Sequence, residues 1–270
     1  MSILFEQPLA LDRAEMMARV LAKQTEAFGY IDFPVLSHAL EPFGEGSVLD
    51  IGTGEGSFLG TLAARHPDVR FVGLEPNAPL LTRARTRIRD LALRNVRLDD
   101  RVFDADYEDT HDVILARFTL QHVREPQGFI RAIYRALNPG GLFVCIEPVY
   151  DYYDGAVDEA VWRAFREKML ATYQQWGSHP NVPKWICPIL ADAGFTSIRA
   201  TLHLYSPITI GHERFAAVVL AAATMLHHEQ PAIWEAAYLE RLAQWIQKPA
   251  SDPFAVIAHI QAFKGSEPSV

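Results

Sequence analysis

The sequence has 270 residues, 49% of them hydrophobic, which suits a single α/β domain with a sizeable core. Its formal net charge of −8 argues against a nucleic-acid partner, because proteins that bind phosphates usually carry a basic face. The two cysteines exclude a disulfide framework, and no stretch approaches the roughly 20 apolar residues of a membrane span. We therefore expect a cytoplasmic protein with no nucleic-acid or membrane partner.

The N-terminal residues 1–45 are predicted to form two helices ahead of the main α/β pattern. Apolar residues recur at helical spacing from Met17 to Phe28, which predicts a helix with one apolar face. A second, shorter helix is expected over residues 34–40. Two roles remain open for these helices, because they either fold over a bound ligand or only pack on the sheet.

A glycine-rich turn follows the apolar pair Val48-Leu49 and reads Asp50-x-Gly52-x-Gly54-x-Gly56. The pair ends a buried strand, and glycines let the backbone turn sharply and approach a ligand with no Cβ in the way. A helix should begin near Ser57, with its free N–H groups directed at that ligand. The Gly-x-Gly-x-x-Gly pattern of dinucleotide-binding units would need a glycine at position 57, so the register disfavours a nicotinamide cofactor.

The next strand is predicted over residues 70–74 and is followed by an acidic residue, Glu75. Nucleotide-binding βαβ units place a carboxylate here, where it accepts hydrogen bonds from ribose hydroxyls. Glu75 therefore indicates a nucleoside ligand without choosing between cofactors.

The glycine turn and Glu75 together resemble the first motifs of the class I S-adenosylmethionine-dependent methyltransferases, a Rossmann-like family. The resemblance implies that Asp50 recognises the methionyl part of the cofactor and that Glu75 takes both ribose hydroxyls. It also implies that a short third strand near Val102-Phe103 leads to the adenine contacts. The cofactor-binding positions that it implies are Asp50, Gly52, Thr53, Gly54, Gly56, Glu75, Pro76, Asp104, Ala105, Ala116 and Arg117.

The resemblance continues as far as Pro148. Residues 111–116 form an apolar strand, and residues 117–123 after it resemble the motif that borders the transferable methyl group. The turn Asn138-Pro139-Gly140-Gly141 and the apolar strand 142–146 then match the family's post-motif. Some relatives hold a metal with glutamates in the 117–123 segment, but Phe118 and Gln121 stand at those places, so we expect no metal.

Beyond residue 148 the pattern loosens, and the fold prediction rests on helix and strand periodicity. The predicted elements are a helix at 158–176, a short helix at 189–193, a strand at 198–204, two or three helices within 213–246, and a last strand within 254–264. We predict a doubly wound α/β fold with a mostly parallel seven-stranded sheet, an antiparallel last strand and helical cover elements. In this single domain, 1–270, the cofactor-binding core spans 46–150, and the cover segments are 150–185 and 211–248.

The leading functional hypothesis is S-adenosylmethionine-dependent methylation of a small molecule at oxygen, nitrogen or carbon, in small-metabolite biosynthesis. The alternatives are a non-catalytic nucleotide-binding or scaffold protein and, disfavoured by the glycine register, an NAD(P)-dependent oxidoreductase. All five tryptophans lie in the cover segments, where we expect them to wall an acceptor pocket. The alternative for Trp234 and Trp245 is a homodimer interface formed by segment 211–248.

Three residues are catalytic candidates: His122, Glu147 and Tyr152. Methyl transfer needs a base only when the acceptor arrives protonated, and an imidazole titrating near pH 6.5 suits that task at neutral pH. Capping or packing is the competing role for His122. The predicted acceptor pocket comprises Tyr30, Phe33, Gln121, Tyr150, Tyr153, His179 and Trp185, with Asp32 a further candidate if the N-terminal helices cover the site.

Overall fold

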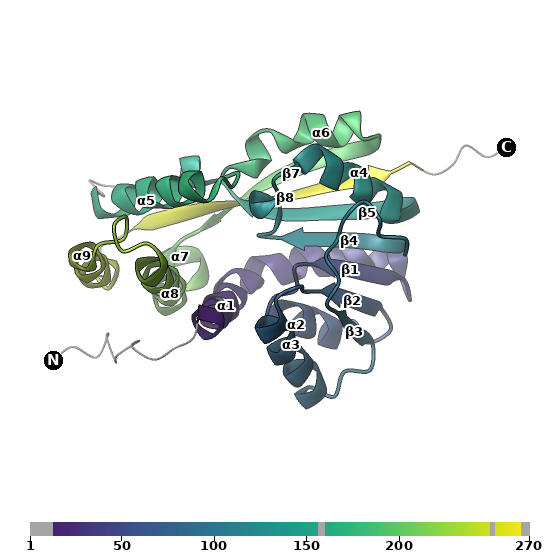
Figure 1. Cartoon of the computed structure of the whole chain (residues 1–270), viewed down its shortest axis with the longest axis horizontal. Helices are drawn as coiled ribbons and strands as arrows, with labels where there is room; N and C mark the ends of the chain where they lie inside the picture. The colour runs from purple at the N-terminus through teal and green to yellow at the C-terminus, as the bar shows by residue number, and fades with distance from the viewer. Residues whose placement is uncertain (1–12, 156–159, 249–251, 266–270) are drawn as a thin grey trace.

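A computed structural model describes residues 13–155, 160–248 and 252–265, and its central feature is a mixed β-sheet (Figure 1). The strands follow the order β3-β2-β1-β4-β5-β8, and β8 also pairs with β7 and with the two-residue β6. Strands β1 to β5 are parallel, whereas β8 runs antiparallel between β5 and β7. The strand bounds are β1 Ser47–Ile51, β2 Arg70–Leu74, β3 Val96–Asp99, β4 His111–Arg117, β5 Leu137–Pro148, β6 Asp154–Gly155, β7 Phe195–Tyr205 and β8 Pro253–Lys264. The predicted α/β class is confirmed, with the antiparallel last strand one place in from the edge.

Helices cover both faces of the sheet, because successive side chains of each buried strand point to opposite sides. Val113 of β4 and Val144 of β5 belong to the core that includes α1 and α2. Their neighbours Ile114 and Phe143 belong to a second core with α4 and α6. The helix bounds are α1 Arg13–Leu40, α2 Ser57–Arg65, α3 Ala78–Asp90, α4 Pro126–Ala136, α5 Ala160–Trp176, α6 Ile186–Asp192, α7 Pro207–Ile210, α8 His212–Glu229 and α9 Ala236–Ile246.

The N-terminal segment forms one continuous helix, α1, so the predicted break before residue 34 is wrong. Pro34 lacks the N–H that would bond the carbonyl of Tyr30, and its ring crowds that carbonyl. Pro34 is exposed and Tyr30 is 68% exposed, so this side of the helix faces solvent and water can satisfy the freed carbonyl. Residues 1–12 of the predicted segment lie outside the described residues.

The third strand is Val96–Asp99, six residues before the predicted Val102-Phe103. Val96 pairs with Phe71 of β2, and the ladder ends at Asp99. Val102 is 61% exposed, whereas Phe103 is buried among the rings of Tyr107 and Phe129. The apolar character of Phe103 therefore reflects packing beneath α4 and not strand pairing.

The cover helices α5, α8 and α9 gather beside the N-terminal half of α1 (Figure 1). Large aromatic side chains of this region point into the molecule: Trp162 of α5 and Phe215 of α8 are each 1% exposed, and Trp234, between α8 and α9, is fully buried. Trp162 stacks on Phe165 with ring centroids 4.7 Å apart.

The predicted start of α5 near residue 158 falls outside the described residues. Within the described ranges, no helix combines the length and apolarity needed to cross a bilayer.

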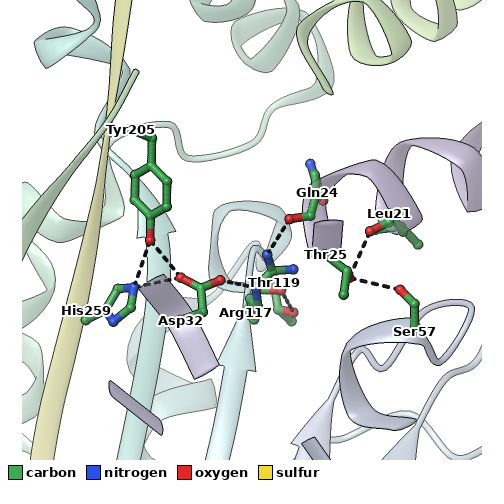
Figure 2. A network of polar contacts seen from close by, with 9 residues as sticks. All are labelled: Leu21, Gln24, Thr25, Asp32, Ser57, Arg117, Thr119, Tyr205 and His259. Carbon is green, nitrogen blue, oxygen red and sulfur yellow. Dashed lines mark hydrogen bonds and ion pairs between the residues drawn. The ribbon is translucent and has the colours of Figure 1, made fainter. Parts of the chain in front are cut away.

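A buried carboxylate fastens α1 across the sheet (Figure 2). Asp32 is fully buried, and its Oδ2 accepts a hydrogen bond of 2.9 Å from Nε of Arg117, at the end of β4. Its Oδ1 accepts one of 2.8 Å from the hydroxyl of Tyr205 and lies 2.9 Å from Nε2 of His259, on β7 and β8. Burial alone would raise the pKa of Asp32, but these partners, Arg117 foremost, hold that pKa below its usual value. About two turns away on α1, Thr25 Oγ1 lies 2.9 Å from Ser57 Oγ, which ties α1 to the start of α2.

Replacing Asp32 by alanine should destabilise the protein by about 3–5 kcal/mol at pH 7, because Arg117 is left buried without its counter-ion. Urea unfolding measures the change. Glu26→Ala is the matched control, an exposed ion-paired acid on the same helix, and should cost less than about 1 kcal/mol. Because the folded-state pKa of Asp32 is lowered, its contribution is present above about pH 4 and is lost as the pH falls further. Equal destabilisation by the two variants would contradict this role.

Candidate functional site

The glycine turn between β1 and α2 adopts backbone conformations that side chains disfavour. Gly54 and Gly56 have φ angles of +61° and +81°, in the left-handed region. A Cβ on Gly54 would lie 2.7 Å from Leu21 of α1, and a Cβ on Gly56 would lie 2.9 Å from the Ala84 backbone of α3. The absence of side chains therefore lets two helices close on the turn.

Glu75, which follows β2, holds this turn in place. Its Oε2 accepts a hydrogen bond of 2.8 Å from the Gly54 N–H, and its Oε1 accepts one of 2.9 Å from the Asn77 N–H. The residue is only 7% exposed, and burial raises its pKa. A carboxylate has about four lone-pair sites, so two remain for the hydroxyl groups of a ligand.

Asp50, at the end of β1, is a buried acid without a cation in direct contact. It is 3% exposed, and its Oδ2 accepts a hydrogen bond of 2.6 Å from the Thr53 hydroxyl. Burial raises its pKa to about 6. Among the described residues it forms no ion pair, unlike the equally buried Asp32. A bound ammonium group would therefore gain a charge-assisted hydrogen bond here.

These groups face a cavity of about 300 Å³ between the glycine turn and α1, which we call the turn cavity. Its walls include Asp50, Gly52 and Glu75 from the sheet edge and Leu21 and Thr25 from α1. The strand order reverses between β1 and β4, and ligands of doubly wound sheets bind at such switch points. The volume is at the lower end of the range for small-ligand sites.

The other predicted cofactor positions differ in whether they line the turn cavity. Thr53, Pro76 and Arg117 line the turn cavity together with Gly54. Ala116 is fully buried in the sheet. Asp104 and Ala105 are exposed and are not among the lining residues, and Ala105 O accepts a hydrogen bond of 3.1 Å from Arg135. The adenine contact of that pair stays a prediction.

A second cavity of about 150 Å³, the aromatic chamber, adjoins the turn cavity. Its walls come from α1, the turn after β4, the end of β5, α5, α8 and β8, and they include Tyr150, Tyr153, Trp162, Phe165 and Phe215. Met17, Leu21, Phe118 and His122 line both cavities, so the two spaces meet at these residues. No Asp, Glu, Lys or Arg is among the described residues that line the chamber.

His122 is the catalytic candidate that borders both cavities. It ends a short 3-10 turn, Leu120–His122, and its ring stacks on Tyr173 with centroids 5.8 Å apart. The residue is exposed where it borders the two cavities, and the packing of protein around its ring lowers the pKa of the imidazole through desolvation. At neutral pH the ring is therefore neutral and able to accept a proton.

Glu147 and Tyr152 occupy different places. Glu147 is fully buried, and its Oε1 accepts hydrogen bonds of 2.7 and 2.6 Å from the N–H groups of Thr119 and Leu120. Burial raises its pKa to about 8, and it lines neither cavity. It therefore fastens the turn that carries His122. Tyr152 is 47% exposed, lines neither cavity and lies near Lys184.

The predicted pocket residues are also divided. Gln121, Tyr150 and Tyr153 line the aromatic chamber. Tyr30 points to solvent, and Phe33 stacks on Phe58 with centroids 4.8 Å apart. His179 and Trp185 pack against each other behind the chamber, where the His179 N–H donates to Gln121 O at 2.8 Å.

The sequence interpretation missed several residues that line the two cavities. Met17, Leu21 and Thr25 line the turn cavity, and Tyr173 and Phe215 line the chamber. The signal available was the apolar stripe of α1, which by itself indicates packing as readily as a ligand.

Comparison with known proteins supports the identification that this geometry suggests. Residues 49–143 match the model of a methyltransferase domain. A demethylmenaquinone methyltransferase of Roseiflexus sp. (strain RS-1) is 33% identical over 103 residues, 38% of this chain and 42% of the relative. An uncharacterized 37.1 kDa protein in transposon Tn4556 of Streptomyces fradiae is 29% identical over 229 residues, 82% of this chain and 62% of the relative. The chain thus spans less than two thirds of the length of these relatives.

The fold is likewise shared with a solved structure, that of the Haemonchus contortus phosphoethanolamine N-methyltransferase 2 in complex with S-adenosyl-L-methionine. The TM-score is 0.60 at 18% identity, covering 96% of this chain and 61% of the other. With the glycine turn, Asp50 and Glu75 in place, residues 49–143 are identified as a methyltransferase domain of the class I S-adenosylmethionine-dependent type. The cofactor that this family implies fits the turn cavity, where Asp50 would hold its ammonium group and Glu75 its ribose.

Affinity for S-adenosylmethionine should fall between pH 7.5 and pH 5. Asp50, with a pKa of about 6, is mostly charged at the higher pH and mostly protonated at the lower. Each pH unit below that pKa lowers the charged fraction about tenfold, and affinity with it. Titration calorimetry at both pH values measures the effect, and Asp50→Asn should flatten it. The matched ligand is 5′-methylthioadenosine, which lacks the ammonium group; an equal pH dependence for both ligands would contradict the assignment.

Proposed function

We propose that this protein transfers the methyl group of S-adenosylmethionine to a small molecule bound in the aromatic chamber. The observation that carries the proposal is the meeting of two unlike cavities at Phe118 and His122, at the carboxyl edge of the sheet. One cavity has carboxylates suited to an amino acid and a ribose, and the other is apolar. When bound, the cofactor supplies an electrophilic methyl group on a sulfonium, so the chain has mainly to align the acceptor and exclude water.

The cover helices support this proposal. Trp162, Phe165 and Phe215 of α5 and α8 line the chamber, and none is available at the surface for a partner. The predicted homodimer through residues 211–248 would have to use other side chains of that segment. The names of the relatives, a demethylmenaquinone methyltransferase and a phosphoethanolamine N-methyltransferase, also point to small-molecule acceptors.

A binding experiment separates this proposal from the oxidoreductase alternative. Calorimetric titration of the full chain should show one site for S-adenosylmethionine and none for NAD. Incubation with methyl-labelled cofactor and a panel of small hydroxyl, amine and carboxylate compounds should then give labelled product. Binding of NAD in place of S-adenosylmethionine would refute the proposal, and cofactor binding without transfer to any acceptor would favour the non-catalytic alternative.

His122→Ala should lower turnover about 10²–10⁴-fold, the range that a positioned general base supplies. Because the chamber surroundings lower the pKa of His122, turnover of the wild-type protein should decline only below about pH 6.5, and the variant should lack this decline. Affinity for S-adenosylmethionine should stay within about twofold. His228→Ala is the matched control, since His228 is an exposed histidine near the end of α8. If His122→Ala lowers turnover by less than about tenfold, His122 is not the general base and only packs against its neighbours.

A further inference from the structure

We propose that the acceptor is a phenol of about one ring, without an anionic group and with a second hydrogen-bond donor that Gln121 recognises. This inference rests on the proposed function and specifies the compound that the aromatic chamber takes. Three features of the chamber carry it: its lack of charge, its volume, and an amide oxygen without a partner.

The chamber has no group to compensate an anionic acceptor. Its described walls lack acidic and basic side chains, and the buried Glu147 lines neither cavity. Removing an anion from water into such surroundings without a partner costs several kcal/mol. Carboxylates and phosphates are therefore excluded as acceptors.

The volume sets the size of the acceptor body. At about 150 Å³ the chamber equals the engineered apolar cavity that binds benzene in a well-studied lysozyme variant. Trp162, Phe165 and Phe215 provide aromatic surfaces around it, and aromatic pairs prefer offset or edge-to-face contacts. One six-membered ring fits this space, and fused rings require the walls to move.

Gln121 supplies the polar contact. The residue is 4% exposed, its Nε2 donates to Phe118 O at 3.2 Å, and its Oε1 has no partner among the described residues. Because a carbonyl oxygen cannot donate, the bond to Phe118 fixes the amide with Oε1 as the free end. An unpartnered buried acceptor costs about 1–3 kcal/mol, which a donor on the bound molecule would recover. Gln24 Oε1 in the same chamber also lacks a partner, but no bond fixes the orientation of its amide.

The reacting group is a hydroxyl because a neutral imidazole stands where the two cavities meet. A neutral amine attacks through its lone pair without help, whereas a phenol must lose a proton. As the phenol oxygen bonds to the methyl carbon, the bond from that carbon to sulfur breaks with its electron pair left on sulfur. The phenolic proton passes to the imidazole of His122. The second donor stays hydrogen-bonded to Gln121 and sets which hydroxyl reacts.

Titration calorimetry of the full chain saturated with S-adenosylhomocysteine tests the proposal without turnover. The probes are the three benzenediols, their monomethyl ethers and 3-hydroxybenzoate. At least one diol should bind about fivefold or more tightly than its ether, and 3-hydroxybenzoate should bind at least tenfold more weakly than that diol. Equal or tighter binding of 3-hydroxybenzoate would overturn the proposal.

Variants assign the donor contact to Gln121. Gln121→Met keeps the length of the side chain and removes the acceptor, so the preference for the diol over its ether should vanish while affinity for S-adenosylhomocysteine stays within twofold. Gln244→Met, an exposed glutamine on α9, should keep the preference. A preference retained in Gln121→Met would overturn the role of Gln121.

Two further results separate failure of this acceptor proposal from failure of the underlying methyltransferase function. Ala222→Phe narrows the chamber from α8 and should abolish diol binding while the cofactor product still binds; unchanged diol binding would show that the probe sits elsewhere and refute the proposal. If Gln121→Met fails to fold, the wild-type probe series still decides the acceptor class. Failure of the wild-type chain to bind S-adenosylhomocysteine would instead refute the underlying methyltransferase function.

Discussion

The ion pair between Asp32 and Arg117 is the interaction on which both cavities depend. It is nearly free of solvent, with side-chain exposures of 7% for Arg117 and 0% for Asp32. A buried ion pair adds little net stability compared with apolar side chains of the same size. Separating the two charges is costly, however, so the pair fixes the position of α1 relative to the sheet. Met17 and Leu21 of that helix line both the turn cavity and the aromatic chamber. A shift of α1 would therefore open both spaces to water at once.

Three carboxylates stand where β1, β2 and β5 end, and the protein environment gives each a different state. Asp50 titrates near pH 6 and is mostly ionised at neutral pH. Glu75 is held by two backbone N–H groups, which partly offset the effect of its burial. Glu147, with a pKa of about 8, is mostly protonated. Negative charge is thus concentrated on the side of the sheet edge that faces the turn cavity, and the chamber side stays neutral. Under the proposed function, this difference favours a cationic cofactor in the turn cavity and disfavours an anionic acceptor in the chamber.

Sequence could predict the parts of the site that depend on short-range constraints. The glycine turn needs backbone angles that few residues adopt, and Glu75 follows its strand directly, so both are visible within one βα unit. The position of β3 was missed because Phe103 is apolar for a tertiary reason, its packing against Phe129. The break in α1 was wrong because Pro34 lies on the solvent side, a fact that depends on how the whole helix is placed.

The aromatic chamber was harder to predict, since its walls come from segments far apart in the chain. Trp162 and Phe215 have ring centroids 5.6 Å apart yet are separated by 53 residues, and no local pattern distinguishes them from ordinary core residues. Their arrangement also explains why the site needs cover helices in addition to the sheet. A sheet edge offers backbone groups and carboxylates, which suit a polar cofactor but leave the reacting methyl group exposed to water. The helices α1, α5 and α8 close that edge with apolar rings, so an acceptor can reach the methyl group in a space from which most water is displaced.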